Sequence, residues 1–90
     1  MAKTADELFD TFAARVAEIL RERFGMDPEP LLRARRESFT IEGLIRRSDG
    51  APKWYGVQAT PEQLQWNGPN ATAEAFVEGY IAAFRAADRA

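Results

Sequence analysis

The chain has 90 residues, a formal net charge of −2 and 46% apolar residues, which predicts one domain around a single modest core. It contains no cysteine and no histidine, which excludes disulfides, thiolate catalysis, cysteine zinc sites and the side chain that most often acts as general base or metal ligand. The net acidic charge argues against bulk attraction to nucleic acid or anionic lipid.

Residues 5–24 carry the strongest helical pattern. Thr4 and Glu7 form a capping-box pair just before the apolar run. Gly25 is expected to end the helix in the left-handed conformation, with Met26 folding back on the last turn. The apolar side chains recur at three- and four-residue steps, as in one stripe of an amphipathic helix: Leu8, Phe9, Phe12, Val16, Ile19, Leu20 and Phe24.

The segment 27–37 predicts a rigid connector, Asp27-Pro28-Glu29-Pro30, followed by a less regular stretch. Residues 31–37 fit a short helical turn, which we favour, or an extended lead-in to the first strand. Leu31 or Leu32 is expected to attach this segment to the core.

Three strands of an antiparallel sheet are predicted at about 38–46, 53–59 and 63–66, because apolar and polar residues alternate there. Turn clusters at 48–52 and 60–62 separate them. The expected inner face carries Phe39, Ile41, Gly43, Ile45, Tyr55, Val57, Ala59, Leu64 and Trp66. The expected cross-strand pairs are Ile45 with Tyr55, Arg46 with Trp54, Ala59 with Leu64 and Val57 with Trp66.

A second amphipathic helix is predicted at about 72–87, capped by Asn70 or Thr72. Its inward stripe comprises Phe76, Val77, Tyr80, Ile81 and Phe84, and Gly79 indicates close packing. The whole chain, 1–90, is therefore expected to form one two-layer α+β domain of order αβββα. Both helices would cover one face of the three-stranded sheet.

No motif for catalysis or cofactor binding is present: there is no Gly-rich phosphate loop, HExxH, CxxC or nucleophile elbow. Glu37 and Glu42 differ in parity and would lie on opposite faces of a strand. We therefore expect no enzyme, no cofactor and no metal. The charged N-terminal residues are not followed by a secretory apolar stretch, and no run could span a bilayer, so a cytoplasmic location without membrane contact is expected.

Charge is segregated along the chain. Residues 33–53 hold six cations against three acids, whereas the flanking segments are acidic. This basic segment could contact phosphates or an acidic protein surface. The residues expected to contact nucleic acid are Arg33, Arg35 and Arg36, and those expected to bind a partner are Leu44, Arg46, Arg47, Lys53 and Trp54.

The outer face of the sheet is expected to expose Leu44 and Trp54 beside Arg46, the composition of an interface hot spot. Two alternatives stay open. Trp54 and Arg46 could form a cation–π pair that only stiffens the hairpin, or this face could be covered by residues 31–36 or by a helix of a partner subunit.

The order helix–three strands–helix resembles that of the double-stranded RNA-binding domain. That family carries a lysine-rich cluster at the start of its last helix, where this chain has residues 71–75, Ala-Thr-Ala-Glu-Ala. The resemblance therefore extends to the fold and not to the binding function. In size, composition and topology the chain also resembles anti-CRISPR proteins, small products of phages and mobile elements that occupy a surface of a nucleic-acid-targeting complex.

We thus expect a non-catalytic protein-binding module, an inhibitor of the anti-CRISPR type. The alternative is a regulator that binds RNA or single-stranded DNA through the basic hairpin, with Trp54 stacking on a base. A third reading is a homodimeric structural protein, joined through the outer sheet face or an unpaired strand edge.

Overall fold

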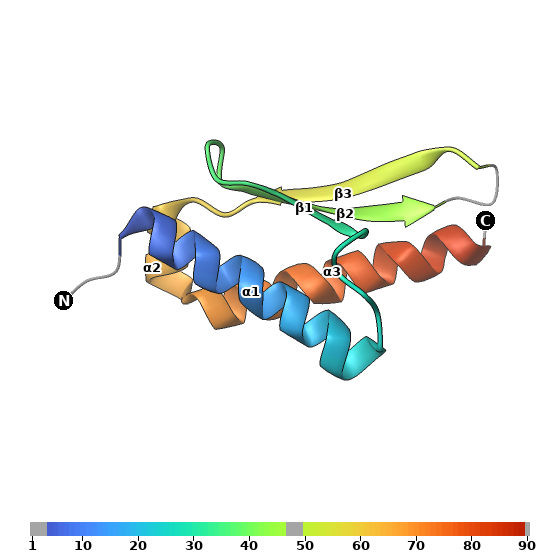
Figure 1. Cartoon of the computed structure of the whole chain (residues 1–90), viewed down its shortest axis with the longest axis horizontal. Coiled ribbons are helices and arrows are strands. Elements are labelled where there is room, and N and C mark those ends of the chain that lie inside the picture. Colours follow the sequence, from blue (N-terminus) through green and yellow to red (C-terminus); the bar gives the residue numbers. More distant parts are fainter. Residues whose placement is uncertain (1–3, 47–49, 90) are drawn as a thin grey trace.

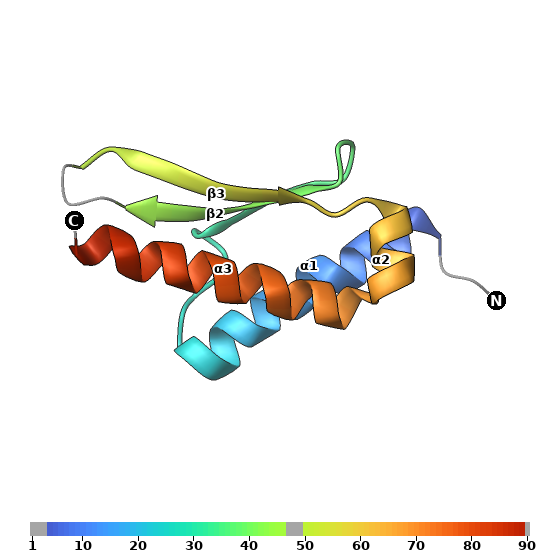
Figure 2. The same ribbon diagram turned by 180° about the vertical axis from the view of Figure 1, so that it is seen from behind.

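The computed structural model describes residues 4–46 and 50–89. The elements are, in order, α1 (Ala5–Phe24), β1 (Leu32–Arg35), β2 (Thr40–Arg46), β3 (Pro52–Gln58), α2 (Pro61–Asn67) and α3 (Pro69–Arg89). The antiparallel strands lie in the order β1-β2-β3, and all three helices lie on one side of the sheet (Figures 1 and 2). The predicted α+β fold with two long helices on one face is confirmed, with a third, short helix added. Within the described ranges, no helix combines the length and apolar character needed to cross a bilayer.

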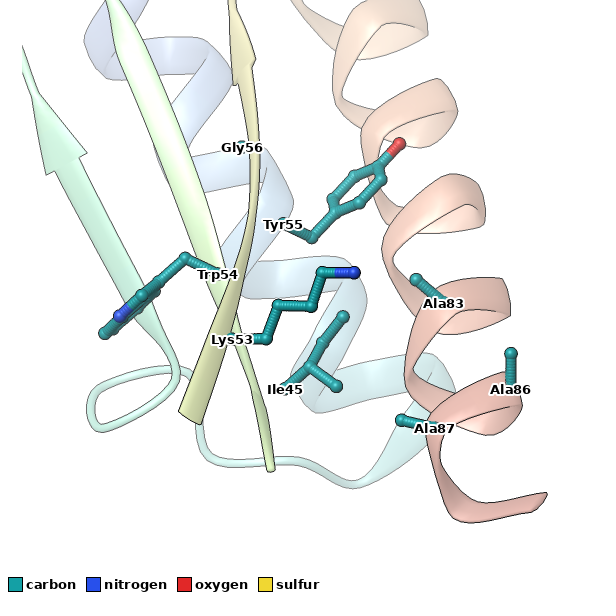
Figure 3. A pocket seen from close by; sticks show the side chains of 8 residues that line it. All are labelled: Ile45, Lys53, Trp54, Tyr55, Gly56, Ala83, Ala86 and Ala87. Atoms are coloured by element: carbon teal, nitrogen blue, oxygen red, sulfur yellow. The ribbon is translucent and has the colours of Figure 1, made fainter. Parts of the chain in front are cut away.

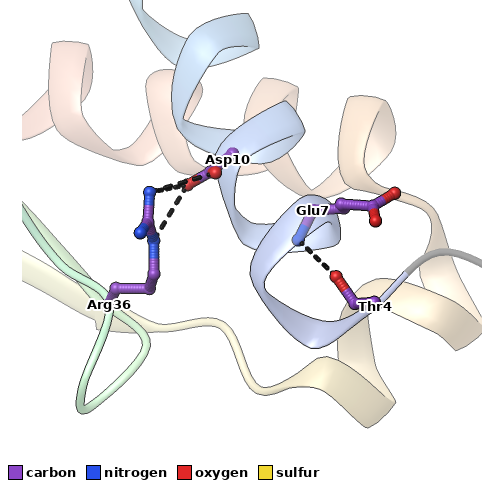
Figure 4. Close-up of polar contacts among 4 residues, drawn as sticks. All are labelled: Thr4, Glu7, Asp10 and Arg36. Atoms are coloured by element: carbon purple, nitrogen blue, oxygen red, sulfur yellow. Dashed lines mark hydrogen bonds and ion pairs between the residues drawn. The ribbon is translucent and has the colours of Figure 1, made fainter.

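Helix α1 has the predicted bounds and caps. The backbone N–H of Glu7 donates to Thr4 Oγ1 at 3.2 Å (Figure 4). At the other end Gly25 adopts a φ of 61°, and the N–H of Met26 donates to the carbonyl of Leu20 at 3.0 Å. A Gly in the left-handed region closes a helix without the Cβ strain that other residues meet there.

The helical turn that we favoured for residues 31–37 is wrong: residues 32–35 form strand β1 instead. Leu32 and Ala34 share the face of their β2 partners Gly43 and Ile41, toward the helices. Arg33 and Arg35, which alternate with them, point to the other face. The sequence of β1 is largely polar because the strand lies at the edge of the sheet with water on one side. Leu32 packs against the core, as expected.

The register of β2 with β3 differs from the predicted one by two residues. Ile45 lies opposite Lys53, Leu44 opposite Trp54 and Gly43 opposite Tyr55. A shift of two residues keeps every side chain on its predicted face, so burial alone could not distinguish the two registers.

The strand predicted at 63–66 is wrong, because these residues belong to α2. Thr60 caps the helix in a reciprocal capping box with Gln63, and Pro61 stands at its first position. Leu64 is buried, whereas Trp66 is 89% exposed instead of facing inward. The expected pairs of these two residues with Ala59 and Val57 therefore do not form.

Helix α3 begins earlier than predicted, at Pro69. Gly68 ends α2 and directly precedes α3, so neither Asn70 nor Thr72 is its N-cap. The hydroxyl of Thr72 instead donates to the carbonyl of Gly68 at 2.8 Å. An ion pair between Arg23 Nη2 and Glu74 Oε1, 2.7 Å apart, joins α1 to α3 at the surface.

The core lies between the helices and the inner face of the sheet. Its buried residues include Phe9, Phe12, Val16, Ile19, Leu20, Ile41, Ile45, Leu64, Phe76, Val77, Tyr80 and Ile81. The inward stripes predicted for the two long helices are confirmed, although Phe24 and Phe84 are only partly buried.

Two tyrosines fit over two glycines where α3 meets the sheet. A Cβ on Gly43 would lie 2.5 Å from the ring of Tyr80, and one on Gly79 would lie 2.2 Å from the hydroxyl of Tyr55. The two rings stack with centroids 6.3 Å apart. The Tyr80 ring lies against Gly43, and its hydroxyl donates a hydrogen bond to the carbonyl of Leu44 at 2.7 Å. Helix and sheet can approach this closely only because each supplies a residue without a side chain.

The hairpin between β1 and β2 is attached to the start of α1. Phe39 adopts a φ of 52° and packs edge-on against Phe9, with ring centroids 5.9 Å apart. Arg36 donates two hydrogen bonds to Asp10 Oδ1, at 3.2 and 2.8 Å (Figure 4). These contacts hold the hairpin in place despite the backbone strain that a left-handed Phe carries.

We predict that Gly43→Ala lowers the free energy of unfolding by about 1–3 kcal/mol, because the added methyl displaces the buried Tyr80 ring. Urea unfolding followed by circular dichroism measures the change. Gly56→Ala is the matched control on β3: its Cβ would come within 3.1 Å of the flexible Glu42 side chain and would make an ordinary contact of 3.6 Å with the carbonyl oxygen of Ile41. Equal losses in the two variants would contradict the packing argument.

Tyr80→Phe should cost about 1 kcal/mol at pH 7, because the hydrogen bond to the Leu44 carbonyl is lost. Desolvation by burial raises the pKa of Tyr80 above its usual 10.0. The unfolded chain therefore ionises first, and the stability contributed by neutral Tyr80 is lost as the pH rises above about 10.

The stability gap between wild type and Tyr80→Phe should accordingly narrow between pH 9 and pH 11 in urea titrations, since Phe cannot ionise. A gap that stays constant over this range would show that burial of the hydroxyl does not couple folding to pH.

Candidate partner-binding face

The face of the sheet opposite the helices, called the outer face below, is not covered by any helix (Figures 1 and 2). It carries alternate residues of the three strands, because side chains alternate along a strand. Three arginines and one glutamate give it a positive charge within an acidic chain. By register its residues are Arg33, Arg35, Thr40, Glu42, Leu44, Arg46, Pro52, Trp54, Gly56 and Gln58.

Trp54 is the largest side chain on the outer face. It lies directly opposite Leu44, and both are half-buried. The guanidinium carbon of Arg33 lies 4.2 Å from the centroid of the Trp54 ring. The alternative of a cation–π pair between Trp54 and Arg46 is wrong, because Arg46 lies opposite Pro52 and the cation over the indole comes from Arg33 on β1.

Arg33 also forms an ion pair with Glu42, its direct neighbour on β2, with Arg33 Nε 3.4 Å from Glu42 Oε1. One arginine thus joins a carboxylate on β2 to an indole on β3. The contact orients the indole across the sheet, away from Lys53 and Tyr55 (Figure 3). Trp54 is therefore positioned before any partner binds, which reduces the conformational entropy lost on binding.

A shallow polar hollow of about 400 Å³ adjoins the hairpin between β1 and β2. Gly56 leaves it open because no side chain projects there. The charged groups at its rim are Arg35 and Glu42. Glu42 is engaged by Arg33, whereas Arg35 has no ion-pair partner among the residues that the structure describes. A carboxylate or phosphate could pair with Arg35 at this position.

The predicted partner-binding residues divide into three groups. Leu44, Arg46 and Trp54 share the outer face. Lys53 points to the helix side of β3, with Tyr55 (Figure 3). Arg47 lies outside the described residues.

The residues predicted to contact nucleic acid also separate. Arg33 and Arg35 belong to the outer face, and Arg36 is held by Asp10 at the hairpin tip. A signal for the first two was available in the sequence, because Leu32 and Ala34 alternate with them.

Trp66 is a surface feature that the sequence reasoning missed. It is the large apolar side chain most exposed in the described part of the chain, on α2 at the end of the molecule remote from the β2–β3 hairpin (Figure 1). The capping box at Thr60 would have indicated a helix, and Leu64 alone would then have occupied its inward face.

The outer face combines three guanidinium groups, the carboxylate of Glu42, a hydroxyl, an amide and the apolar pair of Leu44 and Trp54. Within residues 4–46 and 50–89, no three carboxylates gather where they could hold a metal ion. Comparisons of the chain with models of protein families, with curated proteins and with solved structures find no match.

A double-mutant cycle between Arg33→Ala and Trp54→Ala should give a coupling free energy of about 0.5–1 kcal/mol in urea unfolding. The matched cycle between Arg46→Ala and Trp54→Ala should give none, because the guanidinium over the indole belongs to Arg33. A larger coupling with Arg46 than with Arg33 would contradict the observed register.

Proposed function

We propose that this protein is a non-catalytic protein-binding module whose partner docks on the outer face. The observation that supports the proposal is the pre-positioned Trp54, paired with Leu44 and held by Arg33 on a face that no helix covers. Trp and Arg dominate the binding energy of many protein interfaces, and they do so best when they lie near the centre and lose little freedom.

The partner surface is expected to be apolar at its centre and acidic at its rim. Trp54 and Leu44 supply an apolar contact, whereas Arg35 and Arg46 have no ion-pair partner within the described chain and flank it along the strands. A partner with carboxylates spaced around an apolar patch would satisfy both cations on binding.

We further propose that the module is an inhibitor of the anti-CRISPR type, which occupies a surface of a nucleic-acid-targeting complex. The support is the small size, the absence of motifs for catalysis and a single face that combines an anchor residue with arginines. On this proposal, binding itself is the activity, and inhibition follows from steric occupation of the partner.

The second candidate is a regulator that binds RNA or single-stranded DNA. Arg33, Arg35 and Arg46 lie on one face with Trp54, as a stacking platform with flanking cations requires. However, one side of the indole already holds Arg33, and Arg36 is engaged by Asp10. These contacts favour the protein partner.

The deciding experiment is affinity capture from the native host with wild type, Trp54→Ala and Trp66→Ala in parallel. Trp66→Ala is the matched control, because it removes an exposed indole from another surface. We expect one protein complex to be retained by wild type and Trp66→Ala and to bind Trp54→Ala about tenfold or more weakly. Circular dichroism should show that all three are folded.

Equal retention by Trp54→Ala and wild type would refute the outer face as the site. Recovery of nucleic acid alone, removed by moderate salt, would instead support the second candidate, because phosphate contacts release counterions and weaken steeply with salt.

A further inference from the structure

The outward edge of β3 is an unpaired strand edge with defined hydrogen-bonding groups. β3 is the last strand of the sheet, with only β2 beside it. The N–H of Ala59 donates to the carbonyl of Phe39 at 2.7 Å. Since hydrogen-bonded and outward residues alternate in an antiparallel ladder, the backbone groups of Trp54, Gly56 and Gln58 point away from β2. The edge thus presents three donors and three acceptors at the spacing of a strand.

A groove of about 430 Å³ lies between this edge and the last turns of α3 (Figure 3). Its helix side is lined by Ala83, Ala86 and Ala87, whose small side chains leave room beside the strand. A fourth strand added to the edge would direct every second side chain toward these alanines. Backbone groups and groove therefore suit the same occupant, an extended segment.

The charge of the groove indicates the chemistry of that segment. Lys53 is the only charged side chain that lines the groove among the described residues, and no carboxylate there balances it. A second copy of β3, residues 52–58, would bring another lysine and no acid. Pairing of two copies through β3 would therefore leave Lys53 without a carboxylate, whereas an acidic segment of another protein would supply one.

The opposite edge is less suitable. β1 has four residues, of which Leu32 and Ala34 direct their backbone groups away from β2, and the N–H of Leu32 already donates to the carbonyl of Pro28 at 2.8 Å. The groove beside this edge is lined by both Arg21 and Glu29. This edge offers fewer backbone partners and already carries both signs of charge.

We propose that the edge of β3 binds an extended peptide segment of a protein partner by strand addition. Alternate small apolar side chains of the segment enter the groove beside α3, and one carboxylate pairs with Lys53. This is a second docking surface, separate from the outer face, because it uses backbone groups of β3 and the side chains on the opposite side of the strand.

The test is a library of acetylated and amidated heptapeptides in which Val, Ile or Ala alternates with any residue. We expect the selected peptides to be enriched in Asp or Glu at one position. Their binding should slow amide hydrogen exchange at Trp54, Gly56 and Gln58. In the free protein these three amides should exchange faster than those of Tyr55 and Val57, which point to β2.

Gly56→Pro is the diagnostic variant, because it removes an N–H that points outward and leaves the β2 ladder intact. It should weaken the selected peptides about fivefold or more without unfolding the domain. Should this variant fail to fold, Ala86→Glu, with Ala82→Glu as control outside the groove, provides the same comparison. Lys53→Glu should abolish the enrichment of acidic residues.

Three results would overturn the proposal. They are the absence of any peptide that binds below about 1 mM, selected peptides that leave the three amides unprotected, and a free protein that is dimeric with these amides already protected. These results do not test the outer face, which depends on the side chain of Trp54. Conversely, Trp54→Ala removes that side chain and leaves the backbone edge and the alanine groove in place, so the two proposals can fail independently.

Discussion

The close approach of α3 to the sheet, through two tyrosine–glycine contacts, is the constraint on which the rest of the structure depends. Tyr80 occupies the space above Gly43, and Tyr55 the space above Gly79. Because Gly43 and Tyr55 are direct cross-strand neighbours, the two contacts form one unit across β2, β3 and α3. The hydrogen bond from Tyr80 to the Leu44 carbonyl fixes the helix at a single depth.

This packing concentrates the helices on one side of the sheet and leaves two surfaces available for partners. On the outer face Arg33 joins Glu42 to Trp54 across all three strands. A groove separates the edge of β3 from the last turns of α3, because the side chains that α3 directs toward this groove are those of alanines. Both surfaces are thus consequences of the fold, and the proposed binding needs no rearrangement of the core.

Local chemistry made part of this structure predictable. The bounds and caps of α1 followed from Thr4 and Gly25, and the inner face of β2 and β3 followed from alternation, since burial forces each such residue to one side. The third strand was misassigned because Gln-Leu-Gln-Trp, residues 63–66, is too short to separate a period of 2 from 3.6. The capping box at Thr60 was the stronger signal.

The candidate site was predictable only in part. Leu44 and Trp54 were correctly expected on the outer face, but the partner of Trp54 depends on tertiary register and on β1, which no local pattern ties to the indole. Lys53 was grouped with Trp54 although strand alternation alone places the two on opposite faces. The position of Arg36 was not predictable from a local pattern, because it pairs with Asp10, 26 residues earlier on α1.

The measurement that tests the central claim most directly is site-specific photo-crosslinking in the native host. A benzophenone amino acid at position 54, in place of the indole on the outer face, should crosslink to one partner protein, whereas the same group at position 66 should not. Crosslinking from position 66 alone, or equally from both positions, would contradict the assignment of the outer face as the binding surface.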